Sequence, residues 1–317
     1  MTDCDALLAG IVADPLEETR WLILADWLEE HDDPRRAELL RLHRRMLATC
    51  CEPDAHPDRA VWQARMVELL IAGVRPCVPQ ETLILPGGVP MTFSFIPPGA
   101  FLMGSEKGEY DEKPVHRVEV SRGFFMGAYP VTQAQWKAVM GTDPSVFKGA
   151  VRPVESVFWG DCQECCEKLR ELTGRRVELP TEVEWEYACR AGTTTEYHFG
   201  NVINTDLANY DGSYDSPKGE YREETTDVDS FPTNAWGLFD MHGNVWEWCA
   251  NGYGPYPKRG KQRKIEKSPS KSHATSHVLR GGCCKLIPKS CRAACRRWNS
   301  PNSHNFFYGF RVCLRLD

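Results

Sequence analysis

Apolar and polar positions repeat with helical spacing through the first 73 residues of the chain. Asp14-Pro15 offers a cap and a proline for the first turn of a helix, and Glu17 stands where a capping box places its acid. The apolar stripe that follows consists of Trp21, Leu24, Trp27 and Leu28. This spacing predicts a helix that starts at Asp14-Pro15 and packs both tryptophans into a core.

The same start signal recurs at Asp33-Pro34 and introduces a second apolar face. The members of that face are Leu39, Leu40, Leu42, Met46 and Leu47. A further helix is predicted from about Ala60 to Ala72, because Gly73 is suited to end it. The pattern therefore predicts a small all-α domain over residues 1–73. The prolines and glycines of residues 74–90 predict a linker.

From Met91 onward the pattern changes to short strands separated by turns. Strands are predicted at Thr92–Ile96 and His116–Val120. Helices are predicted from Thr132 to Gly141, from Trp159 to Leu172 before Gly174, and after the capping box of Thr181 and Glu184. Residues 191–234 show little periodicity and predict a long ordered loop region, which needs a metal or dense packing to organise it.

The composition argues against several classes of function. The 317-residue chain has a net charge of -6, so as a whole it is not built to coat nucleic acid or an anionic membrane. No apolar run is long enough to span a membrane, and Met1–Gly10 lacks the basic start of a signal peptide, which predicts a cytoplasmic protein. The basic run Lys258–Lys271 predicts a solvated loop. Nucleic acid is not expected as a partner, because no aromatic residues interleave this run.

The chain has 14 cysteines, including the adjacent pairs Cys50-Cys51, Cys165-Cys166 and Cys283-Cys284. Adjacent cysteines are poor candidates for bonding to each other, because disulfide geometry is demanding. Most are therefore expected to be reduced and buried thiols. Neither Cys162-x-x-Cys165 nor His273-x-x-x-His277 completes a four-ligand zinc signature, and core thiols with a loop histidine pair explain them better.

Six sequence blocks occur in an order that resembles the formylglycine-generating enzyme (sulfatase-modifying factor) family. They are PPGAFLMGS (97–105), YPVTQAQW (129–136), LPTEVEWEYACRAG (179–192), FPTNAWGLFDMHGNVWEW (231–248), LRGG (279–282) and GFR (309–311). The resemblance covers residues 91–317 and implies an α+β, C-type-lectin-like fold with little regular secondary structure. The stretch LILADWLEEHDDP resembles a helical module found in planctomycete proteins, which implies coupling to a partner.

The family resemblance also implies two calcium sites inside the loops. One would use Asn244, the Val245 carbonyl and the Glu247 carboxylate, with the Gly243 carbonyl nearby. The second would use four further positions, which are Asn209, the Tyr210 carbonyl, Glu220 and the Arg222 carbonyl. Calcium prefers oxygen ligands of these kinds. The alternative is that Asn244 and Glu247 hydrogen-bond a turn that holds no ion.

Enzymes of the family bind Cu(I) between two cysteines spaced Cys-x4-Cys, since two thiolates suit this soft ion. By the same count, the second cysteine falls on Cys291 and the first falls on Leu286, which cannot bind metal. The serine that normally follows the two glycines is replaced by Cys283. Copper-dependent formylglycine formation is therefore not expected, although it remains the alternative function, with Cys291 as its catalytic residue.

The C-terminal block resembles the variable proteins of diversity-generating retroelements, which display hypervariable side chains on this fold. A fixed frame that includes Gly282, Cys291, Arg296 and Gly309 alternates with assorted other residues. The predicted ligand-binding residues are Cys283, Cys284, Lys285, Leu286, Ile287, Lys289, Arg297, Trp298, His304, Phe306, Phe307 and Tyr308. Rigid aromatics with arginine are typical of protein-binding surfaces. The alternative is that residues 306–308 form a buried strand, although alternation would still turn one face outward.

Overall fold

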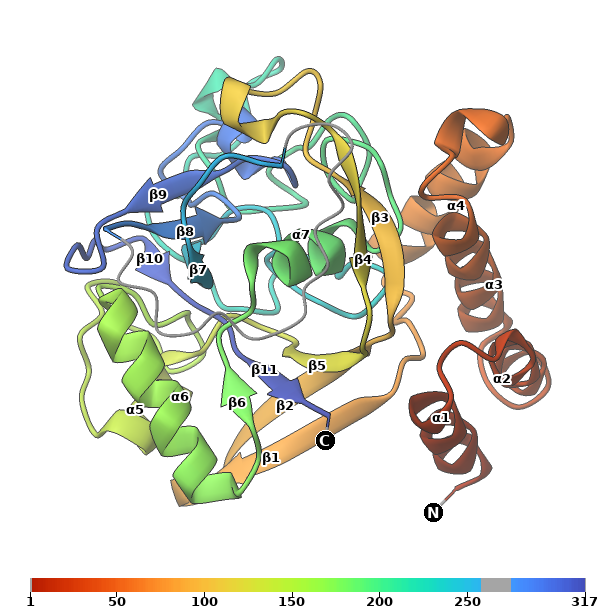
Figure 1. Ribbon diagram of the computed structural model, residues 1–317, viewed down its shortest axis with the longest axis horizontal. Coiled ribbons are helices and arrows are strands. Elements are labelled where there is room, and N and C mark those ends of the chain that lie inside the picture. The colour runs from red at the N-terminus through yellow and green to blue at the C-terminus, as the bar shows by residue number, and fades with distance from the viewer. Residues whose placement is uncertain (1, 258–274, 317) are drawn as a thin grey trace.

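The computed structural model describes residues 2–257 and 275–316. Helices near the N-terminus stand beside a larger body of strands and loops (Figure 1). They are α1 (Asp3–Ala13), α2 (Glu18–His31), α3 (Pro34–Ala48) and α4 (Arg59–Ile71), with a short 3-10 turn, η1 (Pro53–Ala55), before α4. In the described part of the chain, no helix is long and apolar enough to cross a membrane.

The predicted helix start at Asp14-Pro15 is wrong. An unpredicted helix, α1, ends at Ala13, and α2 begins only at Glu18. Glu17 caps α2 through its own carboxylate, which accepts a hydrogen bond from the Thr19 amide at 3.0 Å. Acidic side chains close to a helix start can fill this role, so the capping signal was real but belonged to a different position.

The next helix starts as predicted, with Asp33 as its cap and Pro34 in its first turn. The stripe residues Trp21, Leu24 and Leu28 are buried, and Trp27 is half-buried. The helices thus form a layered packing whose apolar faces meet, as the spacing predicted.

Buried polar contacts attach this helical segment to the rest of the protein. The Arg59 guanidinium donates to the carbonyl oxygens of Met46, at 2.8 Å, and Gly192. The Gln63 amide donates to the Thr195 hydroxyl at 2.7 Å. Because Arg59 is buried, these bonds replace water at its charged group and join α4 to the loop that follows α7.

A five-stranded sheet has the order β1-β2-β5-β11-β6, and every neighbouring pair in it is antiparallel. Its strands are β1 (Gln80–Leu85), β2 (Val89–Ile96), β5 (Phe124–Gly127), β6 (Val177–Glu178) and β11 (Cys313–Arg315). The tight turn η2 (Pro86–Gly88) joins the first two. The predicted linker over residues 74–90 therefore contains a strand of this sheet, and its prolines and glycines mark a hairpin turn.

A second sheet has the order β10-β7-β8-β9, with β10 parallel to β7 and the other pairs antiparallel. Its strands are β7 (Trp246–Gly252), β8 (His277–Arg280), β9 (Arg297–Asn299) and β10 (Tyr308–Gly309). A separate hairpin consists of β3 (Gly99–Met103) and β4 (His116–Val120), with η3 (Tyr110–Glu112) in its connection.

The described part of this body contains three helices that start where predicted, the first and third after the predicted caps Thr132 and Thr181 and the second at Trp159. They are α5 (Gln133–Met140), α6 (Trp159–Thr173) and α7 (Glu182–Arg190), and Gly141 and Gly174 end the first two in the left-handed conformation. Residues 191–234 form the predicted loop region, which contains one 3-10 turn, η4 (Gly212–Tyr214).

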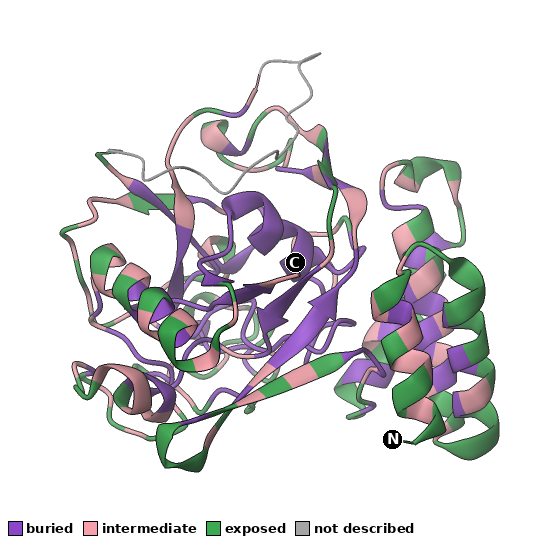
Figure 2. Cartoon of the chain, turned by 60° about the horizontal axis from the view of Figure 1, so that its bottom comes forward, coloured by how far each residue is buried: buried purple, intermediate pink, exposed green. Residues whose placement is uncertain are grey.

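Helix α7 lies at the centre of the body, and all of its residues are buried (Figure 2). Two of its buried side chains, Glu182 and Glu186, are carboxylates that would be costly to bury alone. Glu186 forms ion pairs with Arg190 at 2.7 Å and with Arg280 from β8. Glu182 accepts two hydrogen bonds from Arg296, at 2.5 and 2.9 Å.

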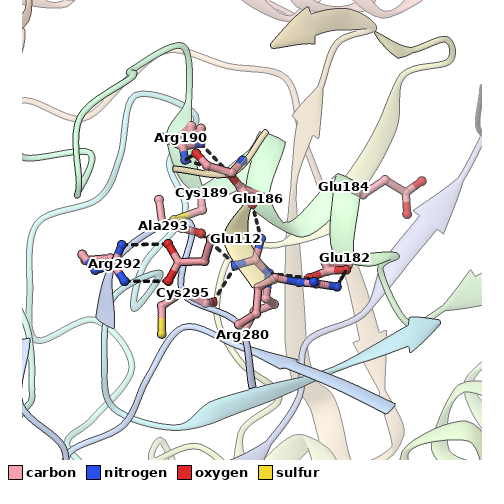
Figure 3. A network of polar contacts seen from close by, with 12 residues as sticks. Glu112, Glu182, Glu184, Glu186, Cys189, Arg190, Arg280, Arg292, Ala293 and Cys295 are labelled. Atoms are coloured by element: carbon pink, nitrogen blue, oxygen red, sulfur yellow. Dashed lines mark hydrogen bonds and ion pairs between the residues drawn. The ribbon is translucent and has the colours of Figure 1, made fainter. Parts of the chain in front are cut away.

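The same network reaches into the C-terminal block (Figure 3). Arg280 also donates to the carbonyl oxygens of Ala293 at 3.0 Å and Cys295 at 2.6 Å. The Arg292 guanidinium donates two hydrogen bonds, of 2.8 and 2.6 Å, to the carboxylate of the buried Glu112. These bidentate pairs hold the backbone of the block against α7 and η3.

The Arg292–Glu112 pair should make a large contribution to stability. Arg292→Met leaves the wholly buried Glu112 carboxylate without its arginine, so we expect the free energy of unfolding to fall by about 3 to 5 kcal/mol. Urea unfolding followed by circular dichroism measures this. The matched control is Arg65→Met, which breaks the exposed Arg65–Glu38 pair and should cost at most about 1 kcal/mol. Equal losses in the two variants would contradict the role of the buried network.

Candidate functional site

The C-terminal block leaves β8 through Gly281 and Gly282, whose backbone conformations favour glycine. Gly281 and Gly282 have φ of 100° and 78°, a region that other residues rarely adopt. A Cβ on Gly282 would lie 2.5 Å from the Cys291 sulfur. The chain therefore folds back on itself at this point, and the short turn η5 (Pro288–Cys291) packs against the glycines.

Several predicted ligand-binding residues point outward from this fixed path. Trp298 is 53% exposed, Phe306 38% and Ile287 37%. Lys289, Arg297 and His304 are also exposed, whereas Lys285, Leu286 and Phe307 are half-buried. These nine positions alternate along the chain with buried frame residues such as Arg292 and Arg296.

Three other predicted ligand-binding residues are buried, and their assignment to a display surface is wrong. Cys283 and Cys284 have no exposed surface, and Tyr308 is 2% exposed. The reason for Tyr308 is its place in β10, where it lies opposite Trp246 of β7. Its hydroxyl accepts a hydrogen bond from the Asn299 amide at 3.0 Å. The predicted alternation in residues 306–308 thus turns Tyr308 inward and leaves Phe306 outside.

Strand β9 sends its two large side chains to opposite faces of the sheet. Arg297 lies across from Leu279, and its guanidinium is 6.0 Å from the ring of Trp246. Trp298 lies across from Val278, and its ring is 5.7 Å from that of Tyr253. The predicted residues therefore belong to two surfaces, with Trp298 separated from Arg297 by the sheet.

A neighbouring loop adds two aromatic side chains that the sequence did not reveal. The ring of Phe147 lies 5.8 Å from that of Phe306, and the ring of Phe158 lies 4.3 Å from that of His304. Phe306 in turn contacts Phe307 at 4.8 Å. We call these five residues the aromatic surface. Residues 142–158 show no periodicity, so no pattern in the sequence indicated that they reach the C-terminal block.

The buried Glu155 holds this loop in place. Its carboxylate accepts hydrogen bonds from the Phe147 amide at 2.8 Å, the Ser156 hydroxyl at 2.7 Å and the Val146 amide. Burial raises the pKa of Glu155 despite these bonds. A carboxylate fixed by the backbone of the loop positions Phe147 beside Phe306 without contacting solvent.

The thiol positions do not form the pair that copper chemistry requires. Leu286 is half-buried at the position of the first cysteine, and Cys291 at the second is wholly buried. Burial and the nearby Cys283 raise the pKa of Cys291 well above its usual range. Burial likewise raises the pKa of Cys284 to about 12. Cys291 therefore lies in the core, with Leu286 in place of a second cysteine.

The Glu247 carboxylate, predicted as a calcium ligand, already has a cationic partner. Arg311 donates to both of its oxygens, at 2.7 and 2.8 Å, and the Trp185 ring donates to one at 2.7 Å. All three residues are buried. Both oxygens of Glu247 thus accept hydrogen bonds from buried side chains.

A second carboxylate near this motif, Asp240, was not predicted as a ligand from the sequence. It is buried, and its side chain accepts one hydrogen bond, from the Asn244 amide at 3.3 Å. Burial raises the pKa of Asp240 to about 8. The side chain of Asn209 contacts the same Asn244 at 3.4 Å, and its own carbonyl oxygen is buried without a hydrogen-bond partner.

The remaining predicted calcium ligands differ in their surroundings. Val245, Gly243 and Tyr210 lie in the buried interior. Glu220 instead has a side chain that is 60% exposed and pairs with the Arg222 guanidinium at 2.7 Å. The side-chain oxygen of Asn209 is buried without a hydrogen-bond partner, and Asp240 accepts its hydrogen bond from Asn244. In the part of the chain that the structure describes, no three His, Cys, Asp or Glu side chains are grouped to hold a metal.

Other sequence features have simple structural roles or fall outside the described residues. Cys162 and Cys165 are buried in the core, in agreement with the core-thiol interpretation. All 14 cysteines are free thiols. His277 stacks on Trp159 at 3.8 Å. His273 and the basic run 258–271 lie outside the residues that the structure describes.

Comparison with known proteins agrees with this architecture. The model of the family described as the sulfatase-modifying factor enzyme 1-like domain matches residues 88–316. The serine/threonine-protein kinase pkn1 of Chlamydia caviae is 32% identical over 246 residues, which make up 68% of this chain but 37% of that protein. The formylglycine-generating enzyme of Mus musculus is 32% identical over 195 residues, which cover 57% of this chain and 49% of the enzyme. The chain thus spans less than half the length of these two relatives.

Among solved structures, the Treponema denticola variable protein 1 superposes with a TM-score of 0.67 and 25% identity, covering 75% of this chain and 99% of that one. The predicted α+β, C-type-lectin-like fold with an N-terminal helical region is confirmed. Six sequence blocks, the matched family model and the shared fold lead to one conclusion: the chain belongs to the sulfatase-modifying factor enzyme 1-like family.

Proposed function

We propose that this protein binds a protein ligand through side chains displayed by its C-terminal block and does not form formylglycine. The observation that carries the proposal is the alternation within residues 280–311 of anchored and exposed positions. Arg280, Arg292 and Arg296 are buried in ion pairs, whereas Ile287 between them and Phe306 after them are exposed. Such a frame tolerates new side chains at the exposed positions, because they contribute little to folding.

The chemistry of the exposed positions suits a protein ligand. The aromatic surface offers rigid rings, and Arg297 and Lys289 add positive charges. Aromatic residues and arginine dominate the binding energy of protein interfaces. The likeness to the Treponema denticola variable protein 1 supports a display role. The helical segment formed by α1–α4 would couple this surface to a second partner, in the cytoplasm.

The alternative function is copper-dependent oxidation of a substrate cysteine. Only membership of the family favours it. Two cysteines would have to hold Cu(I) and supply the redox chemistry. Here Leu286 occupies one position and the other, Cys291, is inaccessible. The genome distinguishes the two functions. A downstream reverse transcriptase, with a near-copy of the codons for residues 280–311 that differs at adenines, supports display, and a neighbouring sulfatase gene supports the enzyme.

The protein should produce no aldehyde when supplied with Cu(I), oxygen and a cysteine peptide that carries the sulfatase recognition motif. The reason is the missing thiol at Leu286 and the burial of Cys291. Mass spectrometry of the peptide detects the loss of the thiol, and the Mus musculus enzyme serves as the positive control. Turnover by this protein that disappears in Cys291→Ala would overturn the non-enzymatic interpretation.

We further propose that a calcium ion is held near Asp240 and Asn209, where it would neutralise a buried carboxylate and organise the 191–234 loops. Asp240 and the partnerless oxygen of Asn209 both lie beside Asn244. Hard cations prefer oxygen ligands of this kind. Glu247 remains the partner of Arg311 and would at most share its charge with the ion.

Calcium at about 100 times its dissociation constant should then stabilise the protein by about 2.7 kcal/mol. This corresponds to a rise in the melting temperature of roughly 5 to 10 °C relative to chelator. Asp240→Asn should abolish the difference, whereas Glu220→Gln, which changes an exposed side chain, should preserve it. Differential scanning calorimetry with and without chelator measures both. Identical melting temperatures for the unchanged protein in the two buffers would contradict the proposed calcium site.

Exposed and buried members of the block should respond differently to truncation. We expect Trp298→Ala and Arg297→Ala to change the free energy of unfolding by less than about 0.5 kcal/mol, because these side chains are exposed. Tyr308→Ala should cost about 3 to 5 kcal/mol, because it empties a buried aromatic position. Urea unfolding of the three variants measures this. If Trp298→Ala and Arg297→Ala also unfold the domain, these residues are core and the display surface is disproved.

A further inference from the structure

The strand register places Arg297 on the side of the second sheet that contacts the 142–158 loop. Arg297 lies opposite Leu279 of β8, and Leu279 lies opposite Trp248 of β7. Side chains paired across neighbouring strands share one face of a sheet. The Trp248 ring donates to the Val157 carbonyl oxygen at 3.2 Å, which joins this face to the loop. Arg297 therefore lies on the same side of the sheet as the loop that carries two members of the aromatic surface.

The guanidinium of Arg297 has no acidic partner among the residues that the structure describes. The loop and the predicted ligand-binding residues contain four other lysines and arginines, and each of them forms an ion pair. The pairs are Lys148–Asp143 at 2.9 Å, Arg152–Glu224 at 2.9 Å, Lys285–Glu223 at 3.5 Å and Lys289–Glu109 at 2.6 Å. Arg297 is exposed and, within the described residues, its side chain forms neither an ion pair nor a hydrogen bond. Its positive charge is thus available to a ligand.

An aromatic ring lies beside this free guanidinium. The Arg297 guanidinium lies over the Trp246 ring, 6.0 Å from its centre, which is within the range of a cation–π contact. Trp246 is 1% exposed, and its ring N–H is buried without an acceptor in the described part of the chain. The Trp246 amide donates to the Phe307 carbonyl oxygen at 2.8 Å, which connects this position to the aromatic surface. Two donors without acceptors, one of them charged, therefore lie together next to Phe307.

We propose that the protein ligand of the C-terminal block presents an acidic side chain to Arg297 and an apolar side chain to the aromatic surface. This inference rests on the proposed binding function and names the chemistry of its ligand. A carboxylate suits Arg297 because the planar guanidinium can donate two parallel hydrogen bonds to it. A ligand without an acceptor at this point would cover the charge and leave it unpaired, which costs affinity. Aromatic side chains around the ion pair exclude water from it.

An acidic side chain fits the surroundings of Arg297 better than a nucleic acid does. The carboxylates that pair with the neighbouring cations include Asp143, Glu223 and Glu224, whose side chains are exposed. A chain of phosphates would bring repeated negative charge close to these groups, and like charges brought together lower affinity. A single carboxylate placed at Arg297 avoids this repulsion.

Selection of a random peptide library displayed on phage against the immobilised full-length protein tests the proposal. The enriched peptides should contain Asp or Glu together with an aromatic or aliphatic residue. Fluorescence anisotropy of a synthetic copy of the most enriched peptide measures its dissociation constant. Arg297→Gln should weaken binding roughly tenfold. Arg297→Lys should weaken it less, because lysine keeps the charge but not the planar donor group. The matched control, Arg65→Gln, removes an exposed arginine of α4 and should leave the constant unchanged.

A double-mutant cycle distinguishes a direct contact of Arg297 from a structural role. Replacing the acidic residue of the peptide with its amide should weaken binding to the unchanged protein about tenfold and hardly affect binding to Arg297→Gln. Thermal melts check that each variant is folded. Equal effects of the peptide change on both proteins, or enriched peptides without Asp and Glu, overturn this inference and leave the binding function in place.

Two further outcomes separate this inference from the function on which it rests. If a single-stranded DNA oligonucleotide binds more tightly than the selected peptide and loses affinity in Arg297→Gln, the ligand of this arginine is a phosphate and the inference is wrong. If no peptide is enriched over a blank surface, the proposed binding function itself fails, and the inference fails with it.

Discussion

The buried carboxylates of α7 are each paired with arginine, and most of these arginines come from distant parts of the chain. Burial alone would raise the pKa of Glu186, yet Arg190 and Arg280 hold it below its ordinary value. Removing one member of such a group leaves an uncompensated charge in the core, which proteins tolerate poorly. The path of the backbone from Arg280 to Arg296 is therefore specified by charge pairing with α7. Exposed residues between these arginines, such as Ile287 and Lys289, take no part in that pairing.

Local signals in the sequence were sufficient for most helices of the body. Thr132 and Thr181 each form a capping box with a residue three positions later, so the information needed to start α5 and α7 lies within one turn. The start of α2 shows the limit of such signals, because Pro15 and Glu17 were compatible with more than one starting residue. Strand β1 was missed for a related reason. Its pairing with β2 depends on a hairpin, and the prolines beside it resemble a linker.

The site could be predicted only in part, because burial is decided by residues far away in the chain. Cys283 and Tyr308 stand among exposed positions, and no local pattern distinguishes them. Tyr308 is buried because β10 adds in parallel to β7, some sixty residues earlier. The pairing of Glu247 with Arg311 is equally distant in sequence. A motif rich in oxygen ligands indicated a metal. In the fold, its Glu247 carboxylate pairs with Arg311, and the side-chain oxygen of Asn209 is buried without a hydrogen-bond partner.

The cysteines also divide into buried and partly exposed side chains. Of the 14 thiols, 11 are buried, and for most of them burial raises the pKa, so that they behave as small apolar side chains. A buried thiol such as Cys313 can neither be reached nor ionised. Cys4, Cys51 and Cys295 differ because their side chains are only partly buried.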